Sequence, residues 1–227
     1  MPELMLADLV RNGTMSPAIA ATIATAAAER RSLLVFAIPR LAGKTTTLRA
    51  ALAHAPAGTP VHELSQAEGA GLGIPAEPDG GYLFVSEIAD TPFPDYLWGE
   101  PVRRVFDALE RGFALATALH APGIDEAFAQ ICHANGVPDT QAARIDLAVY
   151  IRALGPDWRA PIARRVAAVH EIQGVTNGVP RTRYLYAWDD EHDRFETVEA
   201  PTRLGTAGGD FERFVDEFTR AASTPAE

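Results

Sequence analysis

Short apolar runs alternate with helix-forming segments over the first part of the chain, and this alternation limits the possible folds more than any other feature. Residues 32–37, 82–88 and 113–119 read "SLLVFA", "YLFVSEI" and "FALATAL". Continuous apolar runs of this length are typical of strands that are buried on both faces of a parallel sheet. The sequence therefore predicts an α/β fold with a mainly parallel central sheet through residue 144.

The pattern changes after residue 144. The segments "IDLAVYIRAL", "RRVAAVHEI" and "RTRYLYAWD" are separated by turns such as "TNG", which predicts antiparallel strands. The segment 208–223 places four apolar residues on one helical face: Phe211, Phe214, Val215 and Phe218. We expect residues 1–144 to form a core and residues 145–227 to add antiparallel strands and a closing helix to the same domain.

Charge and cysteine content exclude several classes of function. Asp and Glu number 30 against 20 Lys and Arg, so the net charge is -10, which argues against binding to nucleic acids or to anionic membranes. Cys132 is the single cysteine, as expected for a reducing compartment. No segment resembles a signal peptide or approaches the roughly 20 apolar residues of a membrane-spanning helix. We expect a cytoplasmic protein that does not insert into a membrane.

One loop has the composition of a phosphate-binding site. Gly43, Lys44 and Thr45 stand between a predicted buried strand and a helix. In phosphate-binding loops of this type, backbone N–H groups hold phosphates, the lysine neutralises charge and the hydroxyl binds Mg²⁺. Ile38 and Leu41 stand where such loops use glycine to reach positive φ. The same residues also fit a helix N-terminus that binds nothing.

Two further polar residues end predicted strands. Glu87 ends the run 82–88 and His120 follows the run 113–119. Taken singly, each fits a solvated residue at the rim of a sheet. Because the carboxyl ends of parallel strands gather at one edge, the two residues and the loop together predict a single site.

The chain resembles the C-terminal ATPase domain of the type II/type IV secretion and pilus ATPases. "IPRLAGKTTTL" is similar to the Walker A motif of this family, "LFVSEIAD" to its Walker B motif, and "FDALERGFALATALHA" to its histidine box. The resemblance covers nearly the whole chain, so we expect the family's N-terminal domain to be missing. It implies a RecA-like P-loop fold that binds ATP and Mg²⁺.

The resemblance also implies roles for individual residues. Thr45 and Glu87 would hold the metal, His120 would contact the γ-phosphate, and Glu63 would be the catalytic carboxylate, with Glu68 as the second candidate. The residues at the nucleotide would be Arg40, Gly43, Lys44, Thr45 and Thr46. Arg40 fits equally well a solvated residue of the loop.

Other positions depart from the family's pattern: Ile38, Leu41, Ser86, Ala89 and Phe113. No Lys or Arg occurs between Arg49 and Arg103, where the family draws some of its arginines. An arginine that stabilises the transferred phosphoryl group contributes about 10³–10⁵ in rate. We therefore expect slow hydrolysis, or hydrolysis that needs a partner's arginines.

Three functions fit these observations. The first is a diverged secretion-type or pilus-type ATPase that binds ATP with Mg²⁺. The second is an inactive P-loop scaffold or regulatory subunit of a secretion or pilus assembly. The third is a P-loop protein of unrelated use. Besides the nucleotide, the resemblance implies other copies of the chain or secretion and pilus proteins as partners.

Overall fold

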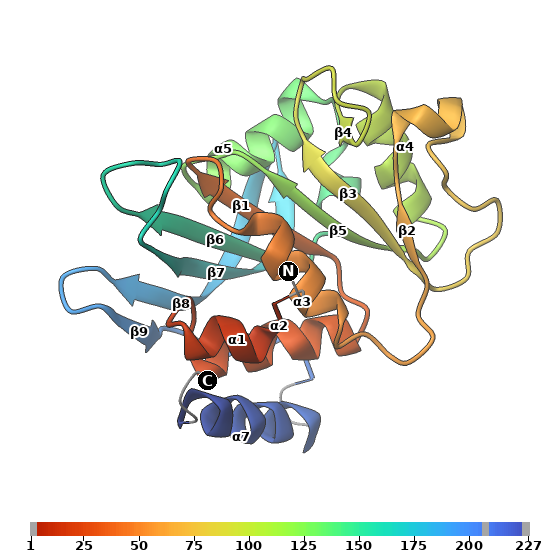
Figure 1. Cartoon of the computed structure of the whole chain (residues 1–227). Helices are drawn as coiled ribbons and strands as arrows, with labels where there is room; N and C mark the ends of the chain where they lie inside the picture. The colour runs from red at the N-terminus through yellow and green to blue at the C-terminus, as the bar shows by residue number, and fades with distance from the viewer. Residues whose placement is uncertain (1–3, 206–208, 224–227) are drawn as a thin grey trace.

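A computed structural model describes residues 4–205 and 209–223 of the 227-residue chain. A nine-stranded sheet runs through this part of the molecule, with helices on both faces (Figure 1). The central strands are parallel and the C-terminal strands are antiparallel. The predicted α/β class and the mainly parallel central sheet are therefore confirmed.

In chain order, the strands are β1 (Leu33–Ile38), β2 (Val61–Glu63), β3 (Tyr82–Ile88), β4 (Tyr96–Leu97), β5 (Ala114–Leu119), β6 (Leu147–Leu154), β7 (Ala163–Thr176), β8 (Val179–Asp189) and β9 (Arg194–Thr197). The helices are α1 (Leu6–Arg11), α2 (Pro17–Ala28), α3 (Lys44–Leu52), α4 (Glu100–Leu109), α5 (Ile124–Ala129), α6 (Asp139–Ala142) and α7 (Gly209–Ser223). Two shorter helical segments are the 3₁₀ helix η1 (Gln66–Gly71) and the π-helix η2 (Gln130–Ala134).

The parallel part of the sheet brings the ends of three strands together. Its spatial order is β2-β3-β5-β1-β6, and β4 adds a short parallel pairing beside β3. On β1, Val35 is level with Ala118 of β5 on one side and Val149 of β6 on the other. Because β1, β3 and β5 point the same way, the loops that follow them meet at one edge of the sheet.

The direction of the sheet changes at β6. This strand pairs with β1 in parallel and with β7 in antiparallel, and β8 and β9 continue the antiparallel part. The prediction that the segment 145–154 begins the antiparallel extension is thus wrong in part, because the sheet changes direction only after this segment. A parallel neighbour requires a crossover of a dozen or more residues, and the segment 120–146 with its helices supplies one.

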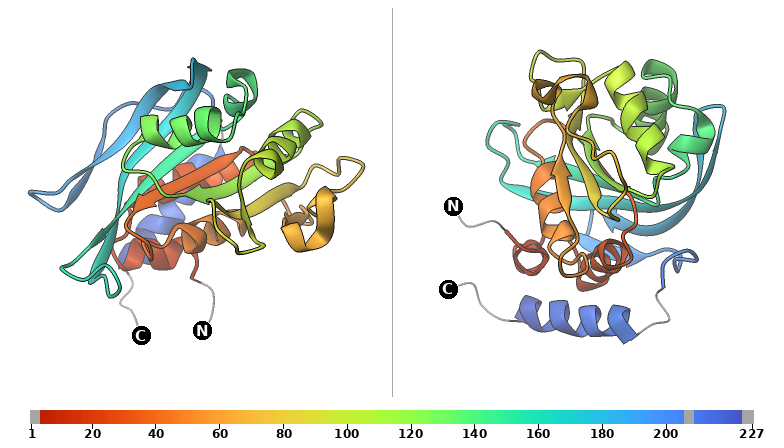
Figure 2. Two further views of the ribbon diagram at one scale, coloured as in Figure 1. Left: turned by 90° about the horizontal axis from the view of Figure 1, so that it is seen from above. Right: turned by 90° about the vertical axis from the view of Figure 1, so that its right-hand side faces the viewer.

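Helices cover both faces of the sheet (Figure 2), and a hydrophobic core lies on each face. Helices α1, α2, α3 and α7 pack on one face, and α4, α5, η2 and α6 pack on the other. Side chains alternate along β1, so that Leu33 and Val35 join the first core while Leu34 and Phe36 join the second. A strand with both faces buried in this way needs the continuous apolar run seen in the sequence.

Two helices follow the sequence pattern closely. The Ser16 hydroxyl accepts a hydrogen bond from the Ile19 amide at 3.3 Å and Pro17 is the first residue of α2, as predicted for a capped helix. In α7, Phe214 and Phe218 are buried and the helix packs against α1 and α2. Crossing a bilayer would need a longer and more apolar helix than any found in residues 4–205 and 209–223.

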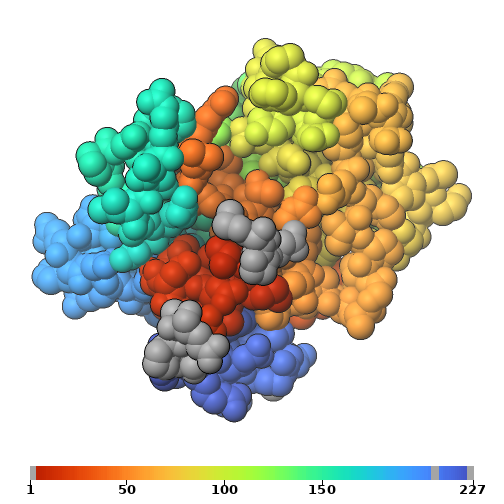
Figure 3. Space-filling view, viewed as in Figure 1, coloured from red at the N-terminus to blue at the C-terminus, as the bar shows by residue number. Residues whose placement is uncertain are grey.

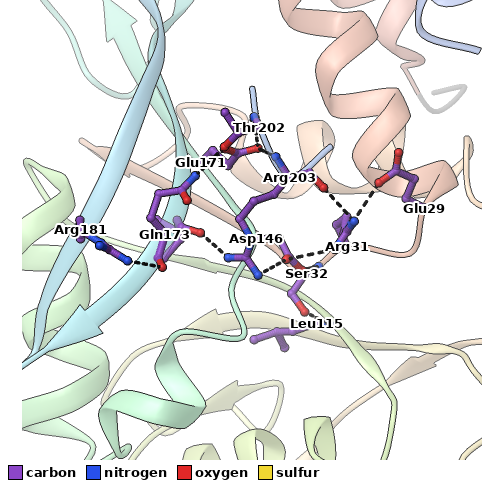
Figure 4. A network of polar contacts seen from close by, with 11 residues as sticks. Glu29, Arg31, Ser32, Leu115, Asp146, Glu171, Gln173, Arg181, Thr202 and Arg203 are labelled. Carbon is purple, nitrogen blue, oxygen red and sulfur yellow. Dashed lines mark hydrogen bonds and ion pairs between the residues drawn. The ribbon is translucent and has the colours of Figure 1, made fainter. Parts of the chain in front are cut away.

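A network of polar contacts ties the C-terminal segment to the amino-terminal end of the parallel strands (Figure 4). Glu171 of β7 is fully buried, and its carboxylate accepts hydrogen bonds from the backbone amides of Thr202 and Arg203. Asp146 accepts one from the Ser32 amide at 2.9 Å, just before β1. These contacts fix the path of the chain as it leaves β9.

Candidate functional site

A cleft of about 710 Å³ opens at the edge where β1, β3 and β5 end. Its described lining includes the loop after β1, the first turn of α3, the ends of β3 and β5, and the start of β7. Asn12 and Thr14, which follow α1, and Tyr96 of β4 also line the cleft. The hairpin between β6 and β7, teal in Figure 3, lies beside the orange loop on the same face of the molecule.

The loop after β1 differs from the one expected. Ile38 is the last residue of β1, with its side chain 45% exposed, and it does not have a positive φ. The left-handed residues are Leu41, with φ 63°, and Gly43, with φ 91°. The conflict was predicted at both Ile38 and Leu41. It is found at Leu41 alone of the two, where a residue with a Cβ enters the left-handed region at a cost in energy.

The start of α3 presents unused backbone donors to the cleft. Gly43 is the N-cap and has no side chain to cap the helix. The amides of residues 44–46 donate to no acceptor among the described residues, and the first helical bond runs from the Thr47 amide to the Gly43 carbonyl. Free N–H groups and the positive end of the helix dipole make such a terminus favourable for an anion.

Lys44, Glu87 and His120 form one cluster at the base of the cleft. Lys44 Nζ lies 3.2 Å from Glu87 Oε2 and 3.2 Å from His120 Nε2. The side chains of Lys44 and Glu87 are only 7% and 8% exposed. The structure thus brings together three predicted site residues from α3, β3 and the end of β5.

One oxygen of Glu87 has no hydrogen-bond donor. His120 Nδ1 lies 3.1 Å from the Ala37 carbonyl, which can only accept, so we assign the proton to Nδ1. Nε2 lies 3.2 Å from Glu87 Oε1, which makes an ion pair when this nitrogen is also protonated, but the two atoms are not in hydrogen-bond geometry. Among the described residues, Oε1 stays buried and unsatisfied, which suits a bound water or metal-bound water.

Burial and charge shift the pKa values of this pair. Burial is the largest effect at Lys44 and lowers its pKa below 10.5, although Glu87 opposes the shift. Burial alone would raise the pKa of Glu87, but the neighbouring His120 and Lys44 outweigh it and lower that pKa below 4.5. Glu87 is therefore ionised at neutral pH and holds the buried lysine.

The metal ligands expected from the sequence both line the cleft. Thr45 is exposed at the first turn of α3, Thr46 follows it, and Glu87 lies at the end of β3. Within the described part of the chain there is no group of three or more His, Cys, Asp or Glu residues that could bind a metal ion. The residues present fit Mg²⁺, which commonly takes one or two carboxylates, waters and the oxygens of a bound phosphate.

Besides Lys44, two arginines bring positive charge to the cleft, and one of them was not predicted. Arg40 lines the cleft from the loop, as expected for a residue near a bound anion. Arg164 of β7 lines it from the other side, and its Nε donates to the Leu41 carbonyl at 3.1 Å. The only signal in the sequence was the pair Arg164-Arg165 at a strand start, and pairing between distant segments is not visible there.

Glu63 does not reach the cleft. Its side chain is 61% exposed and forms an ion pair with Arg49 at 2.9 Å. Glu68, the second candidate, lies exposed in η1 and is also absent from the lining residues that are described. Glu87 is thus the only carboxylate among the described lining residues. No side chain in the described cleft has the place expected of a second, water-activating carboxylate.

Comparison with known protein families finds no model that matches the chain, and comparison with curated proteins finds no match either. The function is therefore inferred from the geometry of the cleft.

Proposed function

We propose that this chain is a Mg·ATP-binding domain of the RecA-like P-loop class, diverged from the secretion and pilus ATPases, and that hydrolysis is slow or depends on a partner. The observation that carries the proposal is the cluster of Lys44, Glu87 and His120 beside the uncapped N-terminus of α3. A lysine, a carboxylate and free amides at the ends of parallel strands are what binding a metal–phosphate group requires.

Each group has a distinct task in this proposal. The amides of residues 44–46 hold phosphate oxygens, and Lys44 neutralises their charge. Thr45 and Glu87 hold Mg²⁺, with Glu87 acting through water at its unsatisfied oxygen. Gly43 keeps the loop open, Thr46 adds a hydroxyl, and His120 lies near the terminal phosphate. The position of β1 between β5 and β6 supports the RecA-like assignment, because ligands of open α/β sheets bind beside such a central strand.

The cleft favours binding over turnover. Hydrolysis needs a metal, positive charge and a group that positions the attacking water. Glu87 is already engaged with Lys44, and Glu63 is paired with Arg49 outside the cleft. Such a site could become active when a partner adds a charged or water-positioning residue to the open side of the cleft. Other copies of the chain, or secretion and pilus proteins in the cytoplasm, are the partners that the resemblance suggests.

The alternative is a scaffold or regulatory subunit that does not hydrolyse ATP. Two observations favour it: the loop uses Leu41 where glycine is expected, and Glu63 lies outside the cleft. Both functions need the same fold, and they differ in whether the cleft binds nucleotide and turns it over.

A titration with ATP, with and without Mg²⁺, tests the proposal. The wild type should bind ATP weakly and better with Mg²⁺. Lys44→Ala should abolish binding, because it removes the only lysine of the 227 residues. Arg49→Ala is the matched control, since it removes a cation of the same helix that pairs with Glu63 outside the cleft. Absence of binding at millimolar Mg·ATP would contradict the proposal and favour the scaffold.

A further inference from the structure

Arg164 reaches from the C-terminal part of the sheet to the loop after β1. Its Nε donates to the Leu41 carbonyl at 3.1 Å. A Cβ built on Gly43 would lie 3.3 Å from Arg164 Cδ, so the aliphatic part of the arginine packs on that residue. The arginine therefore covers the two left-handed residues of the loop at once.

Leu41 has little else to hold its conformation. Its φ is 63° and the residue is 56% exposed, so packing does little to compensate for the left-handed backbone. In the described structure, no other side chain forms a hydrogen bond with residues 39–43. The contact from Arg164 is thus the one side-chain hydrogen bond to these five residues within the described structure.

The adjacent arginine shows how Arg164 differs. Arg165 binds Asp193 through two hydrogen bonds of 2.7 Å, so its guanidinium is fully engaged in a structural pair. Arg164 has no carboxylate partner among the described residues, and its two Nη nitrogens donate to none of them. Since Arg164 also lines the cleft, its charge is available to an anion there.

We infer that Arg164 is a positioning residue of the phosphate loop: it holds Leu41 in the left-handed conformation that glycine would adopt freely, and it turns its Nη nitrogens towards the bound phosphates. This inference rests on the proposed nucleotide function. It explains how a loop without the usual glycines keeps a shape that can receive an anion. Arg164 also supplies, from the same chain, a positive charge that we expected a partner's arginine to supply.

A double-mutant cycle between residues 164 and 41 tests the inference. Arg164→Ala should weaken the binding of Mg·ATP about tenfold or more, the order expected from strain at a left-handed residue. In a Leu41→Gly background the same change should weaken it only about threefold, because glycine adopts this conformation without strain. Arg164→Lys keeps the charge without the Nε donor and should bind less well than the wild type. Arg159→Ala, on the same hairpin and stacked on Trp158, is the matched control.

The melting temperature of the same proteins without ligand gives a second measurement. Arg164→Ala should lower it more in the wild-type background than in the Leu41→Gly background. The positioning role would be overturned if Arg164→Ala lowered the melting temperature equally in both backgrounds. It would also be overturned if Arg164→Lys bound Mg·ATP as well as the wild type does. If the wild type binds no ATP, the proposed function fails, and the ligand-free melting temperatures still decide whether Arg164 positions the loop.

Discussion

Lys44 carries more of the proposed function than any other residue. It is the only lysine of the chain, it is buried, and it forms an ion pair with Glu87. A phosphate that enters without a metal must compete with Glu87 for the same ammonium group and is repelled by the carboxylate. Mg²⁺ removes this conflict, because its charge, held beside Glu87 through water, offsets the carboxylate and leaves the lysine to the phosphate. The ion pair between Lys44 and Glu87 is thus the reason why binding should depend on Mg²⁺.

His170 should make the stability of the protein depend on pH. Burial lowers its pKa from 6.5 to about 4, although Asp125 opposes the shift. Between pH 6.5 and pH 4, His170 therefore binds a proton in the unfolded chain but not in the folded chain. The contribution of His170 to stability is present above pH 6.5 and is lost as the pH falls towards 4. Between pH 7 and pH 5 we expect a loss of about 1–2 kcal/mol in the free energy of unfolding.

Urea unfolding at several pH values measures this loss. His170→Phe keeps a ring stacked on Tyr184, whose centroid lies 4.7 Å away, and should flatten the dependence between pH 7 and pH 5. His192→Gln changes an exposed histidine and should leave the dependence as it is. An unchanged slope in His170→Phe would assign the effect to other groups, such as His54, whose pKa burial also lowers.

At the scale of elements, the sequence predicts what depends on local pattern. The buried strands β1, β3 and β5 follow from continuous apolar runs, and their carboxyl ends bring Glu87 and His120 to one edge of the sheet. The direction of β6 depends on a distant neighbour, so local pattern did not give it. The conformation of the loop after β1 was harder still to predict, because the Leu41 carbonyl is bound by Arg164, which is 123 positions away in the sequence.

Glu63 shows a second limit of reasoning from strand ends. The resemblance to the secretion and pilus ATPases implied that Glu63, at the end of a short strand, would be the catalytic carboxylate beside Glu87. β2 is the outermost strand and only three residues long, and Arg49 of α3 pairs with Glu63 at the surface. The position of a residue at a strand end predicts the edge of the sheet on which its side chain lies. The residue with which this side chain pairs depends on tertiary packing, which the sequence does not reveal.

The segment that leads to α7 should depend on Glu171. Its carboxylate accepts hydrogen bonds from the backbone amides of Thr202 and Arg203 and from the Thr202 hydroxyl, and it is fully buried. In Glu171→Gln an NH₂ group would face these donors, leaving buried polar groups unpaired. We expect the free energy of unfolding to fall by about 1–3 kcal/mol. Urea unfolding measures the loss, and Glu199→Gln, which alters a surface pair with Arg183, is the control. An equal effect of both substitutions would contradict the role of Glu171.

At the scale of the whole molecule, the cleft differs in charge from the rest of the chain. The net charge is -10, yet the described lining of the cleft combines Arg40, Lys44 and Arg164 with a single carboxylate, Glu87. A cleft lined by one sign of charge raises the local concentration of ligands of the opposite sign. We therefore expect the cleft to favour a small anion, as the proposed nucleotide function requires.

The isolated chain should bind ATP without turning it over at an ordinary enzymatic rate. Lys44, the α3 amides and Arg164 suffice to hold phosphates, but the described cleft offers no carboxylate for water besides Glu87. Because Glu87 must also serve the metal, the attacking water has no dedicated base. The contributions to the rate of catalytic groups that act as a unit are not additive. The absence of a dedicated base alone can therefore remove most of the rate. We expect a turnover far below about 1 s⁻¹, the lower end of the usual range.

Phosphate release by the purified protein measures the turnover. Any residual activity should disappear in Lys44→Ala and Glu87→Gln, while Glu63→Gln should behave as the wild type, because Glu63 lies outside the cleft in its pair with Arg49. A rate of about 1 s⁻¹ or more would restore an ordinary ATPase. If that rate were lost in Glu63→Gln, Glu63 would have to take part in the reaction. Its ion pair with Arg49 would then break when nucleotide binds, and β2 would move so that Glu63 reaches the attacking water.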